Sequence, residues 1–504
     1  MDDLNSEITD IKPLILNFSL PEPERAWSNI VSFINSNPDG FELINENLYH
    51  VAMLFSCSQF LANHCINNPQ SLFQALGSMH LPLNADDMRF ELREQLSLCP
   101  SINEGMKAIR NFRKDKQLII TLKDLLKKTL LQQIMAEMSD LADVILSESL
   151  VFVENILQQR YGVPENNAIT IISLGKLGAQ ELNYSSDVDF IAVYRNEGET
   201  TGVPNIHGVR MNKVTVFEYY SKLIEDYSRF LSANTEDGFA YRIDLRLRPQ
   251  GQRGSLALSL RGYEEYYESW GQLWERAAML RARPVAGDAW LGEEFINLLK
   301  PFVYRKYLDF EAIEEIRKMK SQVEYLKPST LSRDIKRGFG GIREIEFFIQ
   351  IFQLIYGGKE PRLRERSTFK ALHILTQKGL IGYDDAYRLS ENYSYFRILE
   401  HRLQQLNDIQ THSLPSGTHE LTVLAKKMGF NTSEEFMVDL TKRRQIVREI
   451  YNSLLGSGQT ENSGHKTINR IFWDTETPIE NILEGRLFNV KDIGRVLHCL
   501  TKIR

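Results

Sequence analysis

The sequence predicts an α+β fold in which a small group of β-strands lies between two long helical regions. Two apolar runs, at 169–174 and 188–194, indicate buried strands. The segment 241–247 alternates strictly between apolar and polar residues, which is the pattern of a half-buried strand. Apolar residues with helical spacing dominate before residue 165 and after residue 291, so we expect the sheet near the centre of the chain.

The 504 residues are more than one hydrophobic core usually holds, and the sequence predicts four parts. These are a helical domain over 1–165, a strand-containing domain over 166–290, a helical bundle over 291–455, and a linker with a partial helical tail over 456–504. The linker is predicted from the small and polar residues that fill 456–467.

The N-terminal region is expected to be a helical scaffold. Apolar residues from Trp27 to Ile34 recur with helical spacing and follow Pro23, which suits the entry to a helix. Further helices are expected over 48–66 and 118–160. No nucleotide-binding motif occurs in this region, so packing or regulation is its expected role.

Two acidic residues, Asp187 and Asp189, stand at the start of the second apolar run. Side chains two apart on a strand project from the same face, so the two carboxylates are expected side by side. Gly175 and Lys176 follow the first run, and Ser186 precedes the second. Hard oxygen ligands of this kind suit Mg²⁺. A divalent-metal site is therefore predicted, and the alternative is an Asp-x-Asp pair in a solvated loop.

The alternating segment that ends at Pro249 adds a third acid. Its polar face carries Arg242, Asp244, Arg246 and Arg248. Asp244 would complete a carboxylate triad, and the guanidinium groups can bind phosphate oxygens in forked geometry. The alternatives are a strand whose polar face meets water, and an Arg246 that pairs with Asp244 or Glu275 instead of a ligand.

A further helix is predicted over 344–356, directly after Gly340 and Gly341. The N–H groups at a helix N-terminus can bind an anion. Lys336 and Arg343 are candidate ligand contacts on the same argument. The alternative is a plain loop-to-helix junction.

The composition excludes several classes of protein. The net charge of −6 gives no sign of a broad nucleic-acid-binding surface, and no apolar run is long enough to span a bilayer. The four cysteines lack Cys-x-x-Cys spacing and are expected to be reduced thiols, while scattered histidines disfavour a zinc site. We therefore expect a cytoplasmic protein without nucleic-acid or membrane partners.

Four motifs, taken in their order and spacing, resemble the bifunctional glutamine synthetase adenylyltransferase/adenylyl-removing enzyme family. They are Gly175-Lys-Leu-Gly-x-x-Glu-Leu-Asn-x-Ser-Ser-Asp-x-Asp189, Asp237-Gly-Phe-x-Tyr-Arg-x-Asp-x-Arg-Leu-Arg-Pro249, Trp274-Glu-Arg-x-Ala-Met-x-x-Ala-Arg283 and Gly340-Gly-Ile-Arg-Glu-Ile-Glu-Phe347. The resemblance covers roughly residues 40–450. Four ordered motifs are much harder to match by chance than any one of them.

The resemblance implies a polymerase-β-like nucleotidyltransferase core flanked by N-terminal and C-terminal helical domains. It implies that Asp187, Asp189 and Asp244 are catalytic and bind Mg²⁺. Together with the residue chemistry above, it makes the candidates for nucleotide or phosphate binding Gly175, Lys176, Ser186, Arg246, Arg248, Lys336 and Arg343. In that family an N-terminal domain removes AMP from a glutamine synthetase tyrosine by phosphorolysis, and a C-terminal one attaches AMP from ATP.

This chain carries one such set of motifs, preceded by a helical region, and its Trp274-Glu-Arg and Gly340-Gly-Ile-Arg-Glu sequences favour the removing half. The expected reaction releases ADP and regulates nitrogen assimilation. The expected partners are glutamine synthetase, the PII signalling protein, and ATP, ADP or phosphate. One alternative is AMP attachment from ATP, and another is a non-catalytic module that binds glutamine synthetase or PII. The chain is expected to be either a fragment or a natural half-length protein.

Overall fold

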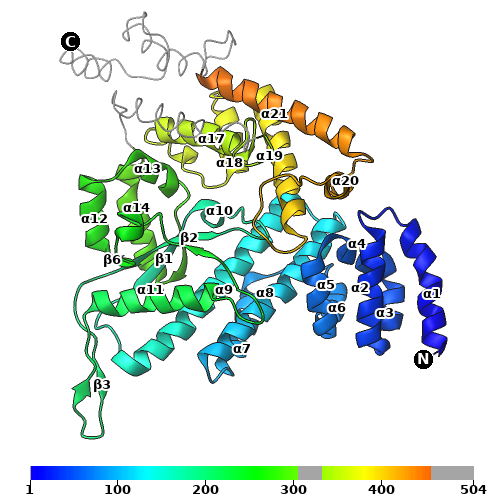
Figure 1. Ribbon diagram of the computed structural model, residues 1–504. Helices are drawn as coiled ribbons and strands as arrows, with labels where there is room; N and C mark the ends of the chain where they lie inside the picture. The colour runs from blue at the N-terminus through cyan, green and yellow to red at the C-terminus, as the bar shows by residue number, and fades with distance from the viewer. Residues whose placement is uncertain (1, 305–331, 456–504) are drawn as a thin grey trace, which may run out of the picture.

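The computed structural model describes residues 2–304 and 332–455, and in these ranges a small sheet lies among many helices (Figure 1). The predicted α+β class is confirmed. The predicted linker and tail at 456–504 lie outside the described residues. None of the helices in the described ranges has the length and apolar character needed to cross a membrane.

The N-terminal part is helical, as predicted. Its helices are α1 (Asp2–Asn17), α2 (Pro23–Ser36), α3 (Phe41–Glu46), α4 (Leu48–Cys57), α5 (Gln59–Asn67), α6 (Pro69–Ser78), α7 (Ala85–Ser97), α8 (Ile102–Leu125) and α9 (Leu131–Tyr161). The helix expected over 48–66 is interrupted at Ser58, whose hydroxyl caps α5 by accepting from the Leu61 N–H. The one expected over 118–160 is interrupted near Lys127, which has a left-handed φ of 53°.

The sheet consists of β1 (Ile169–Ser173), β2 (Val188–Tyr194), β5 (Ile243–Asp244), β6 (Ala257–Ser259) and β7 (Arg283–Gly287). Strand β1 runs antiparallel to both β2 and β7. The other edge of β2 pairs in parallel with β5 near its start and with β6 near its end. A separate hairpin, β3 (Val203–Pro204) and β4 (Arg210–Met211), projects away from the helices (Figure 1).

Both faces of the sheet are covered, which explains the unbroken apolar runs of β1 and β2. On one face Ile171 and Phe190 share a core with α8, α9 and α11 (Val216–Ser232). On the other, Ile172 and Ile191 share a core with α12 (Leu260–Ser269) and α14 (Ala289–Val303). Helices α8 and α9 thus belong to the core of the sheet as well as to the helical region before it, and the domain boundaries stay predictions.

The strand predicted over 241–247 is wrong in length, because only Ile243 and Asp244 join the sheet. The Arg248 guanidinium donates to the carbonyls of Leu245, Gln252 and Gly254 and closes the following residues into a loop. Strand β6 then takes the place on the edge of β2 that a longer strand would have occupied.

The C-terminal part is a second group of helices with its own core. Its members are α17 (Ile342–Tyr356), α18 (Thr368–Gln377), α19 (Tyr383–Gln404), α20 (Thr418–Lys427) and α21 (Ser433–Leu455). The helix predicted over 344–356 is confirmed as α17, and Ile345, Phe348 and Phe352 on its apolar face are buried. Of two shorter helices, α10 (Gly175–Gly178) packs against β1 and β2, and α13 (Leu273–Met279) packs against α14 and α17.

A buried cluster around Asp124 of α8 joins the two helical regions. Its carboxylate accepts from the Arg402 guanidinium at 2.7 and 2.9 Å, from the Gln405 amide at 2.8 Å and from the Tyr184 hydroxyl at 2.9 Å. Burial alone would raise the pKa of Asp124, but Arg402 and His401 outweigh it and hold this pKa below its usual range. The cluster therefore requires an ionised Asp124.

Asp124→Asn should destabilise the protein strongly, because it leaves the buried Arg402 guanidinium without an opposing charge. Removing one partner of a buried ion pair costs roughly 3–5 kcal/mol, and urea unfolding followed by circular dichroism measures it. The matched control is Asp86→Asn, which removes the exposed partner of Arg89 on α7. Its expected cost is below about 1 kcal/mol, and equal effects of the two substitutions would contradict the analysis.

Candidate active site

The turn after β1 brings the backbone of Gly175 against the Asp189 side chain. Gly175 has a left-handed φ of 57°, and a Cβ atom there would lie 2.5 Å from Asp189 Oδ2. The next-door Leu174 N–H donates to the Asp189 carbonyl at 2.9 Å. Only glycine combines a left-handed backbone with the absence of a Cβ atom, so Gly175 allows the turn to lie this close to the Asp189 carboxylate.

Strand pairing brings the three predicted carboxylates to one edge of the sheet. In the parallel pairing of β2 with β5, Asp189 lies opposite Asp244. Asp187 stands two residues before Asp189, directly ahead of β2, and its charge acts on the Asp189 carboxyl. Burial, followed by the charges of Asp244 and Asp187, raises the pKa of Asp189 to about 7, although Lys336 and Arg246 partly oppose the rise. The site therefore concentrates negative charge and attracts cations.

Asp187 and Asp244 each have a basic partner in this structure. Arg242 Nε donates to Asp187 Oδ1 at 2.8 Å, and Gln410 Nε2 donates to Asp187 Oδ2 at 3.0 Å. Arg246 Nε lies 3.0 and 2.9 Å from the two oxygens of Asp244 and, by hydrogen bonding, lowers the pKa of that carboxyl. The alternative pairing of Arg246 with Asp244 is thus the one observed.

In the ranges 2–304 and 332–455, no three acidic, histidine or cysteine side chains are oriented around one point so as to hold a metal ion. The donor types nevertheless fit Mg²⁺, since two carboxylates on paired strand positions and a third directly before β2 supply hard oxygens beside a glycine turn. Arg246 engages both oxygens of Asp244, so this ion pair would have to open before Asp244 could join the other two carboxylates around an ion.

Lys176 does not face the carboxylates, contrary to its prediction as a ligand contact. It is buried, forms an ion pair with Glu346 of α17 and donates to the Tyr393 hydroxyl of α19 at 3.3 Å. Burial, followed by the charge of Arg397, lowers the pKa of Lys176 to about 8. Its ammonium group therefore links the turn after β1 to the C-terminal helices α17 and α19.

Arg248 is likewise committed elsewhere, because its guanidinium satisfies the three loop carbonyls described above. Its buried position does not support the predicted phosphate contact. Arg246, by contrast, has a side chain that is 66% exposed. Ser186 is half-buried directly before Asp187.

The anion site predicted at the N-terminus of α17 is wrong. The Ile342 and Arg343 N–H groups donate to the carbonyls of Ile335 and Lys336, and the Gly340 N–H donates to Glu344. These donors are therefore not available to a ligand. The Lys336 ammonium, whose charge lowers the pKa of Asp189, forms no side-chain hydrogen bond within the described residues, and the Arg343 side chain is exposed.

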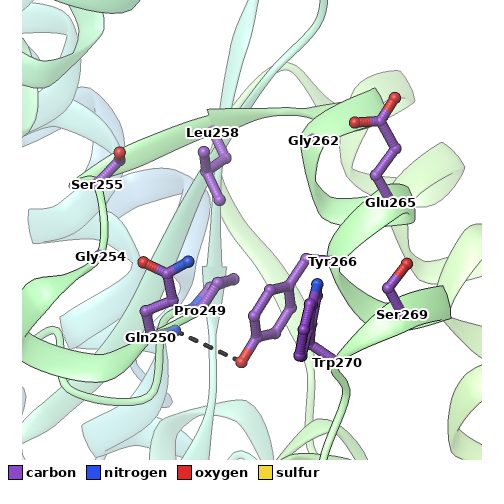
Figure 2. Close-up of a pocket in the computed structure, with 10 residues that line it drawn as sticks. All are labelled: Pro249, Gln250, Gly254, Ser255, Leu258, Gly262, Glu265, Tyr266, Ser269 and Trp270. Atoms are coloured by element: carbon purple, nitrogen blue, oxygen red, sulfur yellow. Dashed lines mark hydrogen bonds between the residues drawn. The ribbon is translucent and has the colours of Figure 1, made fainter.

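The Trp274-Glu-Arg motif is mainly structural. Glu275 accepts from the Gln272 N–H at 2.8 Å and from the Tyr266 hydroxyl at 3.0 Å, which caps α13. The buried Arg276 donates to the Val303 carbonyl at the end of α14. A cavity of about 410 Å³ lies nearby, between the loop at 249–255 and α12, and Figure 2 shows the Tyr266 and Trp270 rings among the side chains that line it.

Sequence reasoning missed the segment 181–185, which it treated as a connection. Glu181 accepts hydrogen bonds from Thr368 and Tyr393, and Arg397 binds the carbonyl of Glu181 as well as the Asn183 side chain. These contacts tie the segment to the C-terminal helices. One feature of the sequence could have indicated these contacts, namely that the segment is rich in polar residues and lies within a motif between two buried strands.

The second half of this segment contacts both helical regions. The Leu182 N–H donates to Ser139 of α9 at 3.1 Å, and the Tyr184 hydroxyl donates to Asp124. Ser185 donates through its N–H to Gln404 at 2.9 Å and through its hydroxyl to the Asp408 carbonyl at 2.8 Å. Gln410 was also missed, and nothing in the local sequence marks it.

Two family models match the chain in sequence. The model of glutamate-ammonia ligase adenylyltransferase matches residues 48–298, which include the three carboxylates. The model of PII-uridylyltransferase matches residues 312–455, which include Lys336 and Gln410.

Curated relatives match most of this chain. A bifunctional glutamine synthetase adenylyltransferase/adenylyl-removing enzyme from Nitrosococcus oceani is 36% identical over 421 residues, which are 82% of this chain and 43% of the relative. Proteins of the same name from Hahella chejuensis and Pseudomonas aeruginosa are 37% and 33% identical, over 80% and 83% of this chain and 42% and 43% of their own length. The chain therefore spans less than half the length of the curated relatives it matches.

Asp189→Asn should change how stability depends on pH. A carboxyl whose pKa is higher in the folded than in the unfolded state contributes stability that is complete below its ordinary value of 3.8 and is lost as pH rises to about 7. The wild type should therefore lose stability relative to Asp189→Asn across this window, by about 1 kcal/mol or less per pH unit. Urea unfolding without divalent cations measures the difference, and parallel pH curves for the two proteins would contradict the raised pKa.

Proposed function

The chain belongs to the glutamate-ammonia ligase adenylyltransferase family, and on that basis we propose that it transfers an AMP group at a tyrosine of glutamine synthetase. The observation that carries this proposal is the pairing of Asp189 with Asp244 across two neighbouring strands. Asp187 precedes Asp189 by two residues and adds the third carboxylate. We include in the proposal a nucleotidyltransferase core of the polymerase-β type, formed by β1, α10, β2 and β5.

Asp187, Asp189 and Asp244 are the proposed ligands of Mg²⁺. The ion would supply charge neutralisation at the attacking and leaving oxygens. The raised pKa of Asp189 supports this role, because a cation would replace the proton that mutual repulsion of the carboxylates favours. Gly175 supports it too, since it lets the turn after β1 reach the Asp189 side chain without a clash.

The proposed direction is removal of AMP. An oxygen of inorganic phosphate attacks the phosphorus of the AMP group, the bond from phosphorus to the tyrosine oxygen breaks, and the tyrosine takes up a proton. The products are ADP and unmodified glutamine synthetase. The Trp274-Glu-Arg and Gly340-Gly-Ile-Arg-Glu motifs support this direction, and AMP attachment from ATP is the second candidate.

Binding of the phosphate groups is assigned to Ser186, Arg246, Lys336 and Arg343. An exposed ion pair is worth about 0–1 kcal/mol, so Arg246 can leave Asp244 for a phosphate oxygen at little cost. Lys336 and the exposed Arg343 lie at the entry to α17. Lys176 and Arg248 have structural contacts instead and are not part of the proposed ligand set.

A regulatory role for the C-terminal helices, through the PII signalling protein, is also proposed. The match of residues 312–455 to the PII-uridylyltransferase model supports it. The alternative of a non-catalytic module is disfavoured, because binding alone would not require three acids on adjacent strand positions. The cytoplasmic location stays a prediction.

Asp187→Asn should abolish most AMP transfer without unfolding the protein, because it keeps the side-chain volume and removes one carboxylate of the site. Loss of a group that merely orients a metal ligand lowers metal affinity or activity about 10–100-fold. Loss of a ligand itself should therefore lower kcat/KM more than about 100-fold. Asp226→Asn on α11 is the control, since within the described ranges its carboxylate pairs only with the exposed Arg229. Normal turnover by Asp187→Asn would refute the metal role.

The direction is tested in two separate reactions with Mg²⁺. In one, the chain receives phosphate and adenylylated glutamine synthetase, and ADP release is expected. In the other it receives ATP labelled in the AMP group and unmodified glutamine synthetase, and little labelling is expected. Strong labelling without ADP release would reverse the direction and leave the site intact, whereas inactivity in both reactions would refute the proposed function.

A further inference from the structure

The Asp187 carboxylate is held by two residues from different parts of the chain. Arg242, directly before β5, donates to one oxygen at 2.8 Å. Gln410, in the segment between α19 and α20, donates to the other at 3.0 Å and is 223 residues away in sequence. Figure 1 shows this segment, drawn in gold, descending from α19 beside the start of β2. The C-terminal helical region thus reaches into the carboxylate site.

We propose that Gln410 is a positioning residue for the cation site, through which the C-terminal helical region completes the catalytic centre. This inference rests on the proposed function, since it assigns to Gln410 the orientation of Asp187 toward a divalent cation. Hydrogen bonds to metal-ligating carboxylates fix their orientation in many metal sites.

The backbone around Gln410 is firmly anchored, although its side chain is exposed. Asp408 accepts two hydrogen bonds from the buried Arg113 of α8, at 2.9 and 3.1 Å, and its carbonyl accepts from the Ser185 hydroxyl. On the other side, the His412 carbonyl accepts from the Ile335 N–H at 2.8 Å. Gln410 therefore stands between two fixed points, and its amide can hold Asp187 in one orientation.

The chemistry of an amide suits this role. An ionised carboxylate only accepts hydrogen bonds, so the NH₂ group of Gln410 faces it. One donor on each oxygen of Asp187 leaves further lone pairs on both oxygens for a cation. A neutral amide orients the carboxylate without adding a positive charge that would repel the cation, as a lysine in its place would.

The test is titration of the whole chain with Mn²⁺ by calorimetry, comparing the wild type with Gln410→Met and Gln410→Ala. Both variants should bind Mn²⁺ about 10–100-fold more weakly, and should need correspondingly more Mg²⁺ for AMP release. At saturating Mg²⁺ their kcat should approach that of the wild type, because no reacting group is lost. Asn407→Ala is the matched control, since Asn407 is exposed in the same segment and its side chain makes no hydrogen bond with the described residues.

Unfolding midpoints of all four proteins should agree closely, which separates positioning from general destabilisation. Unchanged Mn²⁺ affinity in both Gln410 variants would overturn the inference while leaving the proposed function in place. A loss of kcat at saturating Mg²⁺ with unchanged Mn²⁺ affinity would overturn it as well. Absence of Mn²⁺ binding and of AMP release in the wild type would refute the proposed function itself.

Discussion

The arrangement of the site depends on a buried polar segment, Glu181–Ser185, that both helical regions hold by hydrogen bonds. Its five residues are almost inaccessible to water, and most of their polar groups form hydrogen bonds with α8, α9, α18, α19 and the segment after α19. Leaving such groups unpaired would cost about 1–3 kcal/mol each, so the segment is stable only when both regions are docked. Asp187 follows it by two residues, and its position therefore depends on the same contacts.

This constraint also explains how like charges can be gathered at one edge of the sheet. Strand pairing places Asp189 opposite Asp244, and burial followed by repulsion from this neighbour raises the pKa of Asp189. Arg242 and Arg246 offset part of the negative charge from within the same domain, while Lys336 acts from the C-terminal region. Negative charge at the site is thus only partly offset by the basic side chains, and a bound cation would favour the ionised form of Asp189.

Local patterns were sufficient to predict part of this structure. The strands β1 and β2 and the helix α17 follow from periodicity alone, whereas the triad of carboxylates was expected from the family resemblance together with the alternating pattern. Contacts between distant residues were not predictable, because no local pattern encodes them: Lys176 meets Glu346 170 residues away, and Arg248 folds back on its own loop. The first N–H groups of α17 were likewise expected to be available to an anion, but they donate to the carbonyls of Ile335 and Lys336.

Hydrogen exchange of the whole chain, followed by mass spectrometry, tests the central role of the segment Glu181–Ser185 most directly. The N–H groups of Leu182 and Ser185 donate to side chains of Ser139 and Gln404, so peptides covering them should exchange as slowly as those from β2. If the segment were an ordinary connection, its peptides would exchange as fast as those from the projecting hairpin at 203–211. That result would contradict the account, because the carboxylates would then lack their fixed support.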